Sequence, residues 1–89
     1  MRLRGEDLTW QEIDGELVIL DLARSSYLTT NGTGAFLAKL LVEERTADDL
    51  VAALVAEYGI EVEQARADAD GFVAELTRLG LLEGVAAAD

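Results

Sequence analysis

Hydrophobic and polar residues change their spacing once along the chain, close to residue 31. Before that point, short runs rich in apolar and β-branched side chains are broken by polar residues, which is typical of strands. Asp14-Gly15 separates the first two runs and is a strong signal for a two-residue hairpin turn. The pattern predicts three antiparallel strands, at residues 8–13, 17–22 and 26–30.

After residue 34 the apolar residues recur every three or four positions, which is the spacing of amphipathic helices. Thr46, followed by two aspartates, is typical of a helix N-cap, and a glycine stands where each of the last two helices should end. The fold class is therefore α+β, with a three-stranded antiparallel sheet followed by three helices. The predicted helices run from Ala35 to Leu41, from Thr46 to Tyr58, and from Glu61 or Val62 to Gly80. The last helix is expected to bury Ala65, Ala69, Phe72, Leu76 and Leu79.

The segment Asn31 to Gly34 joins the last strand to the first helix and contains two glycines. It can be interpreted as a hairpin turn, as a phosphate-binding loop or as a helix cap. A dinucleotide loop would need a third glycine where Leu37 stands, and no lysine follows in the P-loop position. Capping by Asn31 or Thr33, with glycine relieving the backbone, is the simpler interpretation.

Length and composition limit the classes of function. Eighty-nine residues predict one domain, residues 1–84, with a disordered tail at residues 85–89. The chain has no cysteine and no histidine, which removes thiol nucleophiles, the usual zinc ligands and the commonest general base, and no cofactor is expected. The net charge of −11 disfavours nucleic acid as a partner. No apolar run is long enough to span a membrane, so we expect a cytoplasmic protein.

The third predicted strand should lie at an edge of the sheet. Unpaired amides and carbonyls along an edge are a template for another chain, and proteins normally protect them with charge, proline or a covering element. Residues 25–30 contain no charge and no proline. Either one of the protein's own helices covers this edge, or the strand is open to a partner.

The order of these elements, and several residues along them, resemble the PqqD-like family of peptide-recognition domains in the biosynthesis of ribosomally made, modified peptides. No single matching residue is specific, but their order and spacing together are, and the match spans nearly the whole chain. The matching residues are Leu20-Asp21, Tyr27, Asn31, Gly34, Leu40-Leu41, Asp68, Phe72, Leu76 and Gly80-Leu81.

Three positions depart from the family pattern. Thr30 stands where the family usually has leucine, and Ala38 stands where it often has tryptophan. On the last helix, Ala69 and Asp70 replace a bulkier apolar pair, which could change the leader residue that is accepted.

The resemblance implies a winged-helix-like recognition element with no catalysis of its own. It implies that the leader segment of a precursor peptide binds as an added strand on the third strand, in a cleft closed by the third helix. The chain also resembles the free-standing small subunit of lasso-peptide systems. That subunit hands the leader, which carries a Tyr-x-x-Pro element, to a separate cysteine protease of transglutaminase-like fold. The expected partners are therefore the leader peptide and this protease.

The candidate binding residues lie on the third strand and along one flank of the last helix. Tyr27 and Thr29 should share one face of the strand, but the sequence does not say which face lines the cleft. On the helix, Ala69 and Val73 are expected to form an apolar floor, with charged neighbours as a polar rim. The predicted peptide-binding residues are Ser25, Ser26, Tyr27, Leu28, Thr29, Thr30, Arg66, Ala69, Asp70, Val73 and Thr77.

Other classes of function remain open at the level of sequence. Strands and three helices also describe a winged-helix DNA-binding regulator, but the last helix carries only Arg66 and Arg78 among several acids. A small enzyme would need a nucleophile with an identifiable base, which the sequence does not offer. A structural subunit could use its edge strand to dimerise, which the mass in gel filtration would test.

Overall fold

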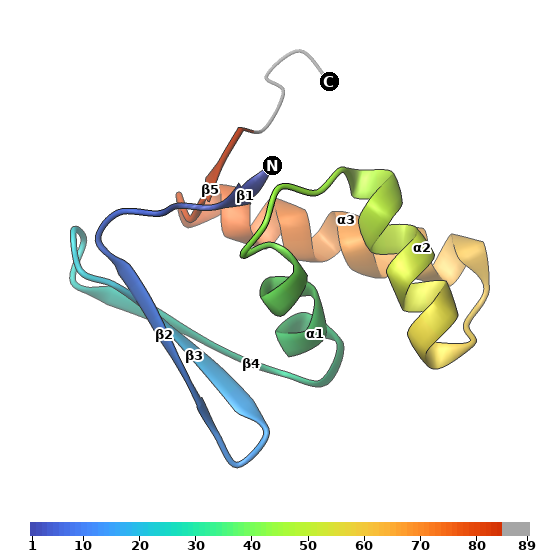
Figure 1. Cartoon of the computed structure of the whole chain (residues 1–89), viewed down its shortest axis with the longest axis horizontal. Helices are drawn as coiled ribbons and strands as arrows, with labels where there is room; N and C mark the ends of the chain where they lie inside the picture. The colour runs from blue at the N-terminus through green and yellow to red at the C-terminus, as the bar shows by residue number, and fades with distance from the viewer. Residues whose placement is uncertain (85–89) are drawn as a thin grey trace.

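The computed structural model describes residues 1–84, and the predicted disordered tail, residues 85–89, lies outside the described residues (Figure 1). One antiparallel sheet has the strand order β2-β3-β4, formed by β2 (Leu8–Ile13), β3 (Glu16–Asp21) and β4 (Ser26–Asn31). Asp14 and Gly15 form the β2–β3 turn with φ of 51° and 83°. Ile13 pairs with Glu16 across this turn. The predicted strands and hairpin are confirmed.

Three helices follow the sheet: α1 (Gly32–Leu40), α2 (Ala47–Tyr58) and α3 (Val62–Arg78). Thr46 caps α2 as predicted, because its hydroxyl oxygen accepts a hydrogen bond from the Asp49 amide at 3.0 Å. The Asp49 carboxylate in turn accepts one from the Thr46 amide at 2.9 Å, which completes a capping box. The three predicted helices are confirmed, with ends that differ from the prediction by a turn or less.

Two very short strands, β1 (Arg2–Leu3) and β5 (Leu82–Glu83), were not predicted. They pair antiparallel in a separate two-stranded sheet, with Leu3 opposite Leu82. The Leu3 amide also donates a hydrogen bond to the Leu41 carbonyl at 2.8 Å. The first residues are thereby fixed to the segments that follow α1 and α3.

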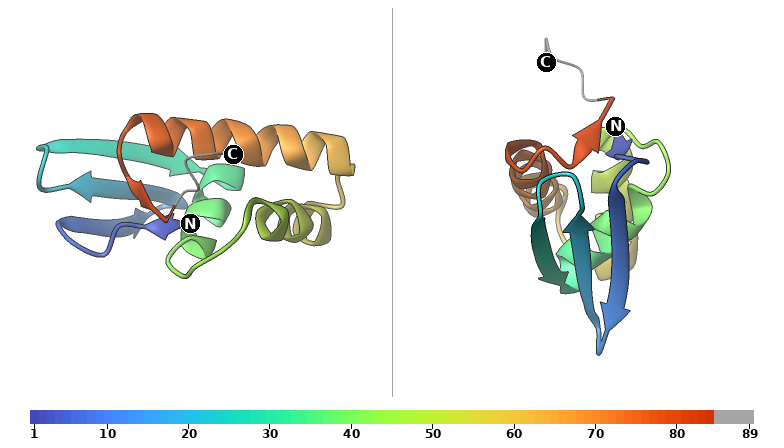
Figure 2. Two further views of the ribbon diagram at one scale, coloured as in Figure 1. Left: turned by 90° about the horizontal axis from the view of Figure 1, so that it is seen from above. Right: turned by 90° about the vertical axis from the view of Figure 1, so that its left-hand side faces the viewer.

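The helices pack on one face of the main sheet (Figure 2). The two views also show the C-terminal half of α3 beside the edge strand β4. Leu17 and Ile19 of β3 are fully buried in this layer, and three leucines of α1, α2 and α3 complete its centre. Those leucines are Leu37, Leu54 and Leu76. Among the described residues, no helix is long and apolar enough to cross a membrane.

Candidate functional site

Strand β4 has a partner on one side only. It pairs with β3 along its whole length, from Ser26 opposite Asp21 to Asn31 opposite Glu16. The described residues contain no strand on its other side. No helix backbone in the described part of the chain hydrogen-bonds to it. An edge that keeps free main-chain groups can accept the backbone of another chain.

The pairing register shows which side chains of β4 face the helices. Leu28 lies opposite Ile19 and Thr30 lies opposite Leu17, and both β3 residues are buried. Directly opposed residues share one face of a sheet, so Leu28 and Thr30 point toward the helical layer. Tyr27 is on the other face, with 72% of its side chain exposed. The register therefore shows which face of β4 meets the helical layer, which the sequence alone did not indicate.

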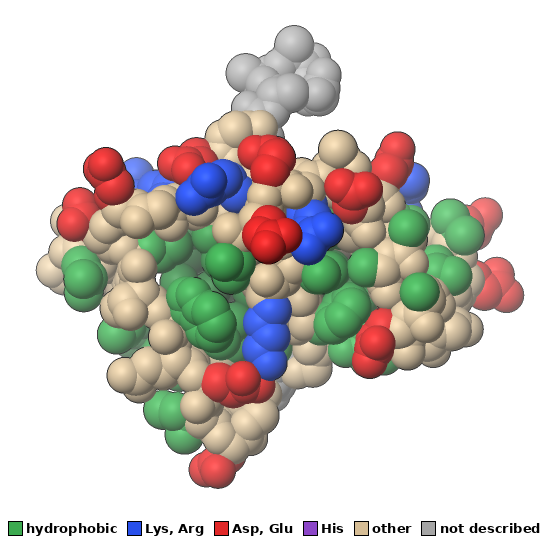
Figure 3. Space-filling view, in the orientation of Figure 1, with side chains coloured by type: hydrophobic (Ala, Val, Ile, Leu, Met, Phe, Trp, Pro, Cys, Tyr) green, Lys and Arg blue, Asp and Glu red, His purple; other side chains and the backbone are tan. Residues whose placement is uncertain are grey.

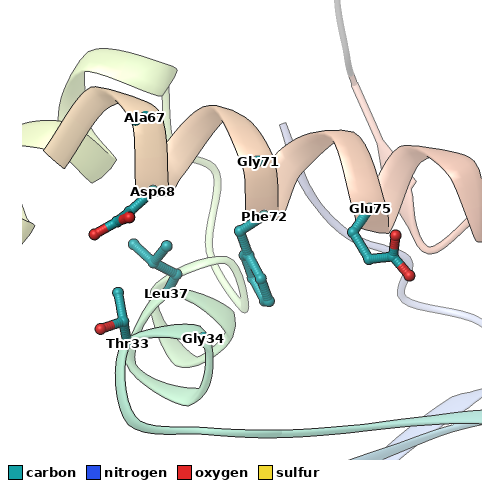
Figure 4. A pocket seen from close by; sticks show the side chains of 8 residues that line it. All are labelled: Thr33, Gly34, Leu37, Ala67, Asp68, Gly71, Phe72 and Glu75. Carbon is teal, nitrogen blue, oxygen red and sulfur yellow. The ribbon is translucent and has the colours of Figure 1, made fainter. Parts of the chain in front are cut away.

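A pocket of about 440 Å³ lies between the first turn of α1 and the middle of α3, next to the end of β4 (Figure 4). The Phe72 ring forms part of its wall, and the Leu37 side chain lies to one side of the ring, toward Asp68 and Thr33. Gly34 on α1 and Gly71 on α3 have no side chains, so the helix backbone itself forms the wall at these two positions. The lining residues are Thr33, Gly34, Leu37, Ala67, Asp68, Gly71, Phe72 and Glu75.

Gly34 allows α1 to approach both β4 and α3. A Cβ atom at this position would clash with the Thr30 hydroxyl and would lie 3.3 Å from Cε1 of Phe72. Only glycine fits there without a shift of its neighbours. The sequence predicted that glycine relieves the backbone at the joint between strand and helix, and Gly32 has the positive φ, 52°, that favours glycine. At Gly34 the reason is instead this close approach.

Arg24 joins the start of β4 to the C-terminal end of α3. Its Nη1 donates a hydrogen bond to the Leu79 carbonyl at 3.0 Å. A Cβ atom at Gly80 would lie 2.7 Å from the guanidinium carbon of Arg24, so a side chain there would push the arginine away. The contact fixes α3 relative to the β3–β4 turn.

Asp21, the last residue of β3, stabilises the β3–β4 turn and is buried, with 1% of its surface exposed. Its Oδ1 accepts hydrogen bonds from Arg4 Nη2 at 2.7 Å and from the amides of Ala23 and Arg24 at 3.1 and 3.3 Å. Burial raises the pKa of Asp21, but these hydrogen bonds and the charge of Arg4 together lower it below its ordinary value. Asp21 therefore supports the start of β4 as a carboxylate.

None of the predicted residues on α3 lines the pocket beside β4. Arg66 points toward α2, where its Nη2 is 2.9 Å from Asp48 Oδ1. The prediction that its side chain lies on the flank of α3 nearest the third strand is therefore wrong. Ala69 is fully buried and Val73 packs partly buried against the core, so neither lines the pocket. Asp70 and Thr77 are exposed and also lie outside its lining.

Phe72 differs from the prediction in a second way. The helical pattern placed it in the core, but the ring is only partly buried and lines the pocket. Sequence reasoning also missed Ala67, Gly71 and Glu75 as wall residues. Small residues at positions 67 and 71, one helical turn apart, are a signal that could have indicated an open groove on this flank.

The fold and the comparisons with known proteins together identify the class of protein, a PqqD-like RiPP recognition element. Residues 16–82 match the family model described as coenzyme PQQ synthesis protein D (PqqD). The chain belongs to the PqqD family, as the sequence resemblance indicated.

Two solved structures are similar to the chain over most of its length. TbiB1 in complex with the TbiA(beta) leader peptide has a TM-score of 0.86 and 29% sequence identity, covering 97% of this chain and 99% of that chain. Lasso peptide synthetase B1 complexed with the leader peptide has a TM-score of 0.77 and 28% identity, covering 90% of this chain and 93% of that chain. A comparison with curated proteins found no match.

Proposed function

We propose that this protein binds the leader segment of a ribosomally made precursor peptide in lasso-peptide maturation, with the leader added as a strand to β4. The observation that carries this proposal is the unpaired edge of β4 beside the pocket of α1 and α3. Both similar structures are described as complexes with a leader peptide, which supports the same ligand class.

Strand addition and the pocket would contribute different parts of the binding energy. The added strand gains main-chain hydrogen bonds along residues 26–30, which are largely independent of the leader sequence. Alternate side chains of that strand point toward the helices or away from them. A leader side chain that points toward the helices would lie against Gly71 and Phe72, so sequence preference would arise there.

The proposed site keeps the strand residues that the sequence predicted and changes the helical ones. Ser26 to Thr30 supply the edge, and Ser25, with φ of 53°, forms the turn before it. On α3 the proposed contacts move to Gly71 and Phe72. Arg66, Ala69, Asp70, Val73 and Thr77 have no part in the proposed contact with the leader.

A peptide selection tests leader binding and does not require the leader sequence to be defined in advance. Displayed peptides with a fixed Tyr-x-x-Pro element and random flanks are selected on the protein, and affinities of the enriched peptides are measured by fluorescence anisotropy. Gly71→Leu fills open space on the groove wall, because no atom lies within 4 Å of a Cβ at this position. We expect this variant to bind at least about tenfold more weakly.

Ala74→Leu is the matched control, because the same helix carries Ala74 at an exposed position outside the pocket lining. It should retain the parental affinity. Gly71→Leu should melt above the parent because leucine has a higher helix propensity than glycine, and Ala74→Leu should melt close to the parent because alanine and leucine are both good helix formers. If Gly71→Leu binds as well as Ala74→Leu, the leader does not lie in this groove.

The proposal includes no catalysis by this protein, because the chain has neither cysteine nor histidine. Cleavage is assigned to a separate transglutaminase-like cysteine protease. The outer face of the sheet supports such a second contact, since no helix within residues 1–84 covers it and it carries Ile13 and Tyr27, which are 53% and 72% exposed. The leader and the protease would then use adjoining surfaces.

The contact with the protease is tested by Ile13→Glu, which places a charge on the outer face away from β4. Val62→Glu is the control, because Val62 is similarly exposed, at 58%, but lies at the start of α3. With the protease of the same pathway, Ile13→Glu should slow leader cleavage while both variants keep their peptide affinity. Equal cleavage rates for the two variants would show that the protease does not bind the outer face of the sheet at Ile13.

A further inference from the structure

The pocket beside β4 is apolar along its middle and acidic at both ends. Figure 4 shows Asp68 and Thr33 at one end, Glu75 at the other, and the Phe72 ring between them. Asp68 and Glu75 are seven residues apart on α3, which separates them by roughly 10 Å along the helix axis. The two carboxylates therefore belong to different ends of the groove and cannot share one small cation.

The two carboxylates differ in their partners. Glu75 is bound by Arg78, whose Nη2 and Nε lie 2.5 and 3.1 Å from the two carboxylate oxygens. These hydrogen bonds lower the pKa of Glu75 and raise that of Arg78, so this end of the groove is close to neutral. Asp68 accepts a hydrogen bond only from the neutral Gln64 amide, at 2.8 Å, among the described residues.

None of the seven basic side chains of the chain forms an ion pair with Asp68 in the structure, and each has another partner. Five are in ion pairs that do not involve the pocket, Arg78 binds Glu75, and Arg24 binds the main-chain carbonyl of Leu79. The five in ion pairs are Arg2, Arg4, Lys39, Arg45 and Arg66. The pocket therefore has one negative charge without an internal counter-ion, although acidic side chains are spread widely over the surface (Figure 3).

We propose that this pocket selects a lysine or arginine side chain of the leader, with its aliphatic stem on Phe72 and its cationic end at Asp68. This inference rests on the proposed function and adds the chemistry of one leader side chain to it. A long basic side chain matches both parts of the pocket, because its methylene groups can cover apolar surface while its charged end pairs with a carboxylate. An apolar side chain alone would cover Asp68 without pairing it, which costs binding energy.

The experiment compares the selection on the parent with selections on two variants of equal charge. Asp68→Asn removes the pocket charge at constant size. Glu57→Gln removes one charge from an exposed position of α2 outside the pocket lining. The peptides are those with a fixed Tyr-x-x-Pro element and random flanks. We expect the parent and Glu57→Gln to enrich lysine or arginine at one flanking position, and Asp68→Asn to lose that preference.

A binding cycle then measures the contact directly. For one enriched peptide, the basic residue is replaced by norleucine or glutamine, and both peptides are titrated against the three proteins. The replacement should weaken binding to the parent and to Glu57→Gln by roughly tenfold, and should have little effect on Asp68→Asn.

The other possible outcomes refute either the role of Asp68 or the proposed function itself. Selected peptides without a basic preference, or with one that survives in Asp68→Asn, refute the role of Asp68 but leave leader binding intact. The same holds if Asp68→Asn weakens all peptides equally, because Asp68 would then bind the common tyrosine hydroxyl. If no peptide is enriched on any of the three proteins, the proposed function itself fails.

Discussion

Gly34→Ala tests the joint between strand and helix on which the site is built. The added methyl group would clash with the hydroxyl of Thr30 and lie 3.3 Å from both Thr30 Cβ and Phe72 Cε1. All three atoms belong to the walls around the pocket or to the end of β4. The variant must therefore turn the Thr30 side chain away, move β4 or α3 away from α1, or strain the helix start.

The magnitude follows from two opposing effects. Overpacking of this kind costs about 1 to 3 kcal/mol, whereas alanine in place of glycine within a helix stabilises by up to about 1 kcal/mol. The net loss is about 1 to 2 kcal/mol, and in a domain of this size 1 kcal/mol corresponds to roughly 4 to 8 °C in melting temperature. We expect Gly34→Ala to melt roughly 4 to 16 °C below the parent.

Gly71→Ala is the control for helix propensity. Gly71 also lies within a helix, but no atom is within 4 Å of a Cβ built there. It should therefore gain the propensity without the clash and melt above the parent. Thermal unfolding followed by circular dichroism compares the two variants, and adding Thr30→Ala to Gly34→Ala should recover part of the loss. A Gly34→Ala variant as stable as Gly71→Ala would show that the contact with Thr30 is not what the structure describes.

Two further predictions concern Phe72 and the buried carboxylate. Phe72→Ala should lower the free energy of unfolding in urea by about 2 kcal/mol, which is less than the usual loss of about 3 to 5 kcal/mol for a buried ring, because Phe72 is partly exposed in the pocket. An unchanged urea midpoint would contradict this packing. Asp21 has a lowered pKa in the folded state, so it stabilises the fold above its ordinary pKa and loses this effect as the pH falls through the folded value. The melting temperature should therefore fall between pH 5 and 3 less steeply in Asp21→Asn than in the parent, and equal slopes would contradict the assignment.

Most of the fold could be predicted because its signals are local. Asp14-Gly15 fixes the hairpin through two positive φ angles, and Thr46 fixes the start of α2 through its own hydrogen bonds. β1 and β5 could not be predicted in the same way. Each has two residues, and their pairing depends on the rest of the fold, which brings residues 2–3 and 82–83 together.

In the proposed site, the strand residues follow from the sequence and the helical residues do not. The absence of charge and proline in residues 26–30 is visible in the sequence and indicates an open edge. On α3 the apolar stripe identifies the buried face, but both flanks of that stripe are partly polar. Which flank lies beside β4 depends on how α3 crosses the sheet, and this is set by contacts such as Arg24 with Leu79 and Arg66 with Asp48.

The most direct test of strand addition is amide hydrogen exchange of β4, measured by NMR with and without the tightest selected Tyr-x-x-Pro peptide. In an edge strand, alternate amides point away from the neighbouring strand and exchange with solvent. We predict that the outward amides among residues 26–30 become protected when the peptide binds, that signals of residues 68–75 shift, and that Asp14 and Gly15 do not change. Peptide binding that leaves every β4 amide as exposed as before, or that shifts mainly residues 48–58, would contradict the account.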